Sequence, residues 1–187
     1  MATGQAERLI PLLEELLAEA GAGWGDLAAL GVGTGPGNFT GVRIGVAAAR
    51  GLALGLGRPA IGVTAFEALA WGREAVLALR DARLGQVHAQ AFGPAAFGPV
   101  TVALDGPLPS PFLRALPSGL PVVGDFAAEM AARVGGRAEA PLAPVAEAVA
   151  RIALARLGGE NPRPAPLYLR PPDAAQPRGA PTRVIPG

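Results

Sequence analysis

Apolar side chains surround almost the whole circumference of the helix that the sequence predicts at 41–56. With residues placed 100° apart, its two apolar faces comprise Val42, Val46, Ala49, Ala53 and Leu56 on one side and Ile44, Ala48, Leu52 and Gly55 on the other. Arg43 and Arg50 supply its only charges. A helix with this pattern needs cover on both sides, so we expect a sheet against one side and a second element against the other.

A second helix with a wide apolar arc is predicted at 9–20, just before Gly21. Its apolar positions are Leu9, Ile10, Leu12, Leu13, Leu16, Leu17 and Ala20. Glu14, Glu15 and Glu19 fall outside that arc. The two apolar helices either cover each other within one chain or meet a partner, and the pattern alone favours neither arrangement.

Strand and helix signals alternate along the rest of the chain. A strand is predicted at 26–32, a second at 59–63, and a helix from Thr64 to Trp71 that begins with a capping box between Thr64 and Glu67. Further predicted elements are a hairpin of 75–80 and 86–92, a short helix at 112–116, a strand at 121–125, and helices at 126–134 and 145–157. This mixture indicates an α/β or α+β protein with a Pro-rich, extended C-terminal tail.

The glycine-rich loop between the first predicted strand and the apolar helix suggests two alternatives. Its residues Gly33, Gly35, Pro36, Gly37, Thr40 and Gly41 could cradle a phosphate at a helix N-terminus. The chain has no lysine for a Walker A motif, and the third glycine of a dinucleotide motif is absent. We therefore favour a tight strand-to-helix turn, capped by Asn38 or Thr40, and expect no bound cofactor.

Composition restricts the classes of function. The 187 residues fit one domain or one domain of two small lobes, and a formal net charge of +1 is a weak footprint for a nucleic-acid binder. Cysteine is absent, which excludes a disulfide framework and a thiol nucleophile. The chain starts without a signal-peptide pattern and has no run of eighteen apolar residues, so a cytoplasmic protein without a membrane segment is expected.

Residues suited to catalysis are few. His88 is the only histidine, and it alternates with Gln86 and Gln90, which predicts a solvated position on the polar face of a strand. Asp81 and Arg83 fit a turn better than a reactive pair. With one histidine and no clustered carboxylates, we expect no metal site and no catalytic residue.

Several separated motifs share one resemblance. The stretch "GVGTGPGNFTGVRIGVAAARGLALGLGRPAIGVTAFEALA" is similar to the signature of the TsaB (YeaZ) family, and "AERLIPLLEELLAEAG" to the helix that precedes that signature. "DARLGQVHAQAF" resembles the family's hairpin and "PLYLRPPD" its C-terminal ending. The resemblance implies an actin-like, ribonuclease-H-like α/β fold of two lobes.

The resemblance also implies a role and partners. Family members assist in making threonylcarbamoyladenosine beside the tRNA anticodon: they do not catalyse the transfer, but pair with the catalytic TsaD, and the ATPase TsaE joins them. TsaC makes the activated intermediate, and contact with tRNA is expected only indirectly. The contact surface, with TsaD or a second copy, would be a helical bundle containing Leu9, Leu12, Leu13, Leu16, Val42, Arg43, Val46, Ala49 and Arg50.

The same resemblance divides the chain into an N-terminal lobe at 1–74, a C-terminal lobe at 75–165 and a tail at 166–187. Family members begin with about thirty residues of strand and hairpin before the first helix, so we expect the first lobe to lack those strands. The alternative functions are an actin-like nucleotide-dependent enzyme and, less favoured because of the single histidine, a metallopeptidase-like homologue.

Overall fold

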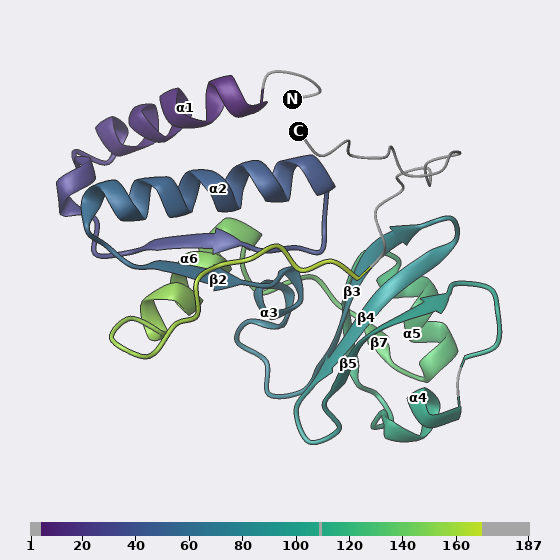
Figure 1. Ribbon diagram of the computed structural model, residues 1–187. Helices are drawn as coiled ribbons and strands as arrows, with labels where there is room; N and C mark the ends of the chain where they lie inside the picture. The colour runs from purple at the N-terminus through teal and green to yellow at the C-terminus, as the bar shows by residue number, and fades with distance from the viewer. Residues whose placement is uncertain (1–4, 109, 170–187) are drawn as a thin grey trace, which may run out of the picture.

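The chain forms two separate sheets with helices on both sides of each (Figure 1). A computed structural model describes residues 5–108 and 110–169. Its first part contains α1 (Gln5–Glu19), the 3-10 helix η1 (Trp24–Asp26), β1 (Leu30–Gly33), α2 (Phe39–Leu56), β2 (Ala60–Val63) and α3 (Ala65–Ala70). Then follow β3 (Val76–Arg83), β4 (Gln86–Phe92), β5 (Phe97–Ala103), α4 (Ser110–Ala115), β6 (Pro121–Gly124), α5 (Ala127–Val134), β7 (Arg137–Ala138) and α6 (Val145–Ala155).

The smaller sheet is the parallel pair β1–β2, in which Leu30 lies opposite Ala60. Helix α2 connects the two strands and packs on one face, and α6 packs on the opposite face (Figure 1). The approach of α6 is close because β1 has no side chain at Gly31: a Cβ there would lie 3.0 Å from the Cβ of Ala153. A small residue in β1 therefore lets the two layers meet.

The larger sheet has the order β5-β4-β3-β6-β7, with β3 antiparallel to β4 and parallel to β6. Side chains of β3 alternate between two cores. Leu77 and Leu79 pack with Met130 of α5 on one face, whereas Val76 packs with Phe66 of α3 on the other. The first half of this central strand is buried on both sides, which explains its continuous apolar run Val76–Leu79.

Helix boundaries follow the local signals of the sequence. Asn38 caps α2, since its Oδ1 accepts a hydrogen bond from the Gly41 amide at 2.8 Å. The predicted capping box of α3 is confirmed by reciprocal bonds between Thr64 and Glu67. The first strand starts later than predicted, at Leu30, because η1 includes Asp26 and residues 27–29 form a connection. The carboxylate of Asp26 accepts a hydrogen bond from the Gly23 amide at the start of η1.

Two features of the fold differ from what the sequence predicted: the lobe to which α6 belongs and the number of strands after the hairpin. Helix α6 falls inside the range 75–165 but packs against β1 and β2, so the first sheet is completed by a late segment of the chain. Strand β5 was not predicted, and it covers the outer edge of β4. Of the expected tail 166–187, only residues up to Leu169 are described, and the rest lies outside the described residues.

Candidate functional site

Helix α2 has one buried side and one exposed side. Val46 and Ala49 are 2% and 8% exposed and pack with Val32 of β1. They therefore belong to the core of this chain, which corrects their assignment to a partner surface. Val42 packs beside the same cluster and is half-buried.

The outward stripe of α2 begins at Arg43 and continues along the helix at three- and four-residue spacing. Ala47, Gly51 and Leu54 follow it, and Leu54 is 86% exposed. Arg50, the other predicted interface arginine, is half-buried at the side of the helix. The stripe is thus apolar except for one guanidinium, although the sequence did not single out its apolar members.

Helix α1 runs over α2 in Figure 1. Leu9, Leu12 and Leu13 are half-buried, while Leu16 is 51% exposed. Of the predicted α1 residues, Leu16 contributes most to the apolar surface. Both helices lie on the same side of the first sheet (Figure 1), and each carries exposed apolar residues.

The glycine loop forms a capped turn from β1 into α2. The amide of Thr34 donates to the Val63 carbonyl at 2.8 Å, and the carbonyl of Gly35 accepts from the Ala65 amide at 2.7 Å. These bonds fix the loop to the end of β2 and the start of α3. Because Asn38 occupies the amide of Gly41, the loop acts as a strand-to-helix connection.

A cluster at the start of α2 joins residues that are far apart in sequence. The guanidinium carbon of Arg43 lies 3.7 Å from the centroid of the Phe39 ring, and its Nε donates to the Tyr168 hydroxyl at 2.7 Å. The two aromatic rings are 5.3 Å apart between centroids. The sequence motifs contain all three residues but give no sign that Tyr168 lies beside α2.

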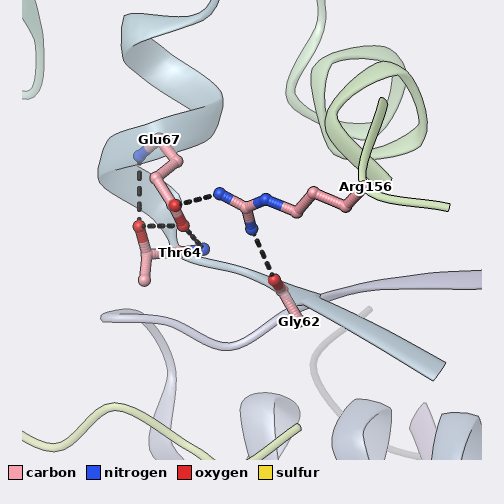
Figure 2. A network of polar contacts seen from close by, with 4 residues as sticks. All are labelled: Gly62, Thr64, Glu67 and Arg156. Atoms are coloured by element: carbon pink, nitrogen blue, oxygen red, sulfur yellow. Dashed lines mark hydrogen bonds and ion pairs between the residues drawn. The ribbon is translucent and has the colours of Figure 1, made fainter. Parts of the chain in front are cut away.

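A polar network ties the first sheet to α3 and α6 (Figure 2). One carboxylate oxygen of Glu67 accepts from the Thr64 amide and hydroxyl, and the other pairs with Arg156, which also donates to the Gly62 carbonyl at 2.9 Å. Burial of the Glu67 carboxyl raises its pKa, but the bonds from Thr64 and Arg156 outweigh burial and leave the pKa below its usual value. Because these groups satisfy one another, the network is a structural tie.

A groove of about 630 Å³ opens beside this network. Its lining includes Thr34, Gly62, Arg156 and residues 159–165. The guanidinium of Arg156 is committed to Glu67, and the lining carries one further charge of each sign, Arg163 and Glu160. The groove therefore has no excess charge that would select an ionic ligand.

His88 is buried, at 6% exposure, which corrects the prediction of a solvated side chain. Its Nδ1 lies 2.8 Å from the hydroxyl of Thr101 on β5. Strand β4 has neighbours on both edges and is buried along most of its length. The alternation of His88 with glutamines therefore did not indicate that the His88 side chain is exposed. His88 is a core residue of the larger sheet.

Within residues 5–108 and 110–169, metal-ligand clusters and helices of membrane-spanning length bear on other classes of site. No group of three or more His, Cys, Asp or Glu side chains in these ranges could hold a metal ion. One helix there, α2, is long and apolar enough to cross a membrane by length and composition alone. In this structure Val46 and Ala49 of α2 pack against Val32 of β1, as the core-facing residues of a helix in a folded lobe do.

Comparison with known proteins supports the resemblance found in the sequence. A family model described as "TsaD: tRNA N6-adenosine threonylcarbamoyltransferase" matches residues 2–96, slightly more than half of the chain. The chain is 44% identical over 88 residues to the tRNA threonylcarbamoyladenosine biosynthesis protein TsaB of Escherichia coli (strain K12). That match covers 44% of this chain and 38% of the E. coli protein.

A longer match and two solved structures extend the similarity. An uncharacterized protein of Mycobacterium tuberculosis (strain ATCC 25618 / H37Rv) is 35% identical over 179 residues, covering 92% of this chain and 78% of that protein. Two Pseudomonas aeruginosa structures, one of YeaZ and one of a protein similar to peptidase YEAZ, match with TM-scores of 0.65 and identities of 26% and 30%. They cover 88% of this chain and 85% and 84% of those chains, respectively.

These structures confirm the predicted α/β fold of actin-like, ribonuclease-H-like type. The sequence matches and the fold agree with each other. The chain belongs to the family whose model is described as TsaD, tRNA N6-adenosine threonylcarbamoyltransferase, and its relatives there include proteins named TsaB and YeaZ.

Proposed function

We propose that this chain serves in tRNA threonylcarbamoyladenosine biosynthesis as a non-catalytic partner of TsaD. The name of the E. coli relative places that protein in this biosynthesis, and the family model carries the name of the transferase itself. A chain related to both is well suited to pair with the transferase. TsaE joins the pair in this proposal, tRNA is contacted only through TsaD, and the complex is cytoplasmic.

The observation that carries the proposal is the outer stripe of α2. After α2 has packed on β1, Ala47, Gly51 and Leu54 remain exposed. Leu16 is exposed on α1, a helix that lies on the same side of the first sheet as α2 (Figure 1). Apolar surface on two adjacent helices is typical of a protein–protein interface. TsaD is the proposed occupant, and a second copy of this chain takes its place when TsaD is absent.

A supporting role rather than catalysis fits the way the ionisable groups are used. Glu67 and Arg156 neutralise each other, Arg73 pairs with Glu139, and His88 is buried beside Thr101. These groups hold elements together, and of the five only Arg156, which is paired with Glu67, lines the groove beside α6. We therefore assign the transfer chemistry to TsaD.

The test is reconstitution of the modification with purified TsaC, TsaD, TsaE, ATP, threonine, bicarbonate and tRNA, with and without this chain. We expect a stable complex with TsaD by calorimetry and modified tRNA only when the chain is present. The isolated chain, mixed with ATP and magnesium, should release no phosphate. ATP turnover by the isolated chain would favour a nucleotide-dependent enzyme, and modification that proceeds equally well without the chain would refute the proposal.

A further inference from the structure

Arg43 is held in one orientation by two aromatic side chains. The carbon of its guanidinium lies 3.7 Å from the centroid of the Phe39 ring and 5.4 Å from that of Tyr168, both within the range of a cation–π contact. The Tyr168 hydroxyl accepts a hydrogen bond from Nε. An arginine normally loses much rotamer freedom when it binds, and here that freedom is already reduced.

The two Nη nitrogens of this guanidinium are not used by its contacts with Phe39 and Tyr168. The bond to Tyr168 uses Nε, and within residues 5–108 and 110–169 neither Nη nitrogen has a hydrogen-bond or ion-pair partner. Phe39 and Tyr168 are themselves 42% and 47% exposed, so the cluster is open to a second molecule. Two parallel N–H donors in a fixed plane match the two oxygens of a carboxylate.

The surroundings of Arg43 favour a protein as the source of that carboxylate. The stripe that continues from Arg43 along α2 is apolar at Ala47, Gly51 and Leu54. A nucleic acid needs several cations along its backbone, but this stripe offers one. Exposed aromatic residues beside an arginine, next to apolar surface, are the composition of a protein-interface hot spot.

The C-terminal segment positions Tyr168. The Leu167 amide donates to the Thr34 carbonyl at 2.8 Å, just after β1, and Leu167 packs against the cluster that contains Phe66. Tyr168 is thereby fixed at the start of α2, although it lies 125 positions from Arg43 in the sequence. The segment thus supplies one of the two aromatic contacts to the α2 arginine.

We propose that Phe39 and Tyr168 hold Arg43 as a preset anchor for a carboxylate side chain of TsaD. This inference rests on the proposed function, because it names the chemistry of contact at the same surface. Arg43 is the residue that contacts the partner, and Tyr168 is a positioning residue that acts through Arg43.

The experiment measures the dissociation constant for TsaD by calorimetry for four variants of the full chain. Arg43→Gln should weaken binding by about 10- to 100-fold, as loss of a hot-spot residue does. Arg43→Lys keeps the charge but cannot present two coplanar donors, so it should recover only part of that loss. Tyr168→Phe keeps the ring but frees the guanidinium, and should weaken binding by about 2- to 10-fold.

Arg151→Gln is the matched control, because Arg151 is also an exposed helical arginine near an aromatic ring, that of Trp71, but on α6. The affinity of Arg151→Gln for TsaD should stay within about twofold of that of the original chain, which is the effect expected of a surface substitution outside the interface. Circular dichroism and melting temperature must be unchanged in all four variants. Raised salt should weaken the original chain more than Arg43→Gln, a difference that a purely structural role would not produce.

A charge exchange completes the test. Arg43→Glu should abolish binding to TsaD, and one variant in a scan of surface Asp or Glu residues of TsaD to Arg should restore it. The inference fails if the original chain binds TsaD and folded Arg43→Gln binds equally well. It also fails if Arg43→Gln weakens tRNA binding while TsaD affinity is unchanged, which would identify a phosphate as the anion. If the original chain does not bind TsaD, the proposed function and this inference fail together.

Discussion

Glu67 and Arg156 lie 89 positions apart and form an ion pair that joins α3 to the C-terminal end of α6. Arg156 also donates to the Gly62 carbonyl of β2, so one guanidinium connects three elements (Figure 2). Glu67 is at the same time the capping-box residue of α3. A single carboxylate therefore serves both local and long-range structure.

We expect Glu67→Gln to lower the free energy of unfolding by about 1–3 kcal/mol, the range for charge-assisted hydrogen bonds. Glutamine retains the capping role at this position, so the loss of unfolding free energy measures the contribution of the ion pair with Arg156. The pKa of Glu67 is lowered in the folded state, so the native protein binds fewer protons than the unfolded chain and the carboxylate stabilises it above the usual value of 4.5. That contribution disappears as the pH falls through the folded-state pKa.

Urea unfolding at neutral pH and at about pH 3 measures this difference. The gap between the original chain and Glu67→Gln should be largest at neutral pH and should close in acid. Arg151→Gln, which breaks the exposed pair with Glu147, should cost less than about 0.5 kcal/mol at either pH. A constant gap for Glu67→Gln across pH would contradict the role of the charge.

Adjacent positions on α2 should respond differently to the same change. Val46→Asp places an unpaired carboxylate against Val32 and should destabilise the monomer by about 3–5 kcal/mol. Ala47→Asp puts the same group on the exposed stripe, so the fold should persist while affinity for TsaD falls at least about tenfold. Circular dichroism and calorimetry distinguish the two, and normal binding by folded Ala47→Asp would exclude the stripe from the interface.

The sequence predicted helix α2 and the need to cover both of its apolar faces, but it could not show which face packs on the sheet. Both faces are apolar, and the choice of the face with Val46 depends on its contact with Val32 of β1, which lies in another element. Capping at Asn38 was predictable because it depends on residues three positions apart. The pairing of Arg43 with Tyr168 was not, since it depends on the path of the chain back to the first sheet.

His88 illustrates a second limit. Alternation with Gln86 and Gln90 indicated a surface strand, but the unpredicted strand β5 supplies Thr101 beside the ring. We expect His88→Ala to lower the free energy of unfolding by about 1–3 kcal/mol, because it removes a buried ring together with its contact to the Thr101 hydroxyl. Modification of tRNA by the reconstituted system, assayed well below the melting temperature, should remain near that of the original chain. Loss of modification with unchanged stability would instead indicate a direct functional role.

Two glycines offer the sharpest test of the backbone, because the same substitution should have opposite signs at them. Gly124 has φ of 101°, which L side chains rarely adopt, and an added Cβ would collide with the Leu79 carbonyl of the neighbouring strand. Gly124→Ala should therefore lower the free energy of unfolding by more than about 3 kcal/mol.

Gly51 lies inside α2 with no heavy atom within 4 Å of an added Cβ. There alanine should stabilise the isolated chain by about 0.5–1 kcal/mol, since it restricts the unfolded state and favours the helix. Thermal unfolding should show a rise of about 2–4 °C per kcal/mol for Gly51→Ala and a large fall for Gly124→Ala. A melting temperature of Gly124→Ala equal to that of the original chain would contradict the close approach of β3 and β6 at this position.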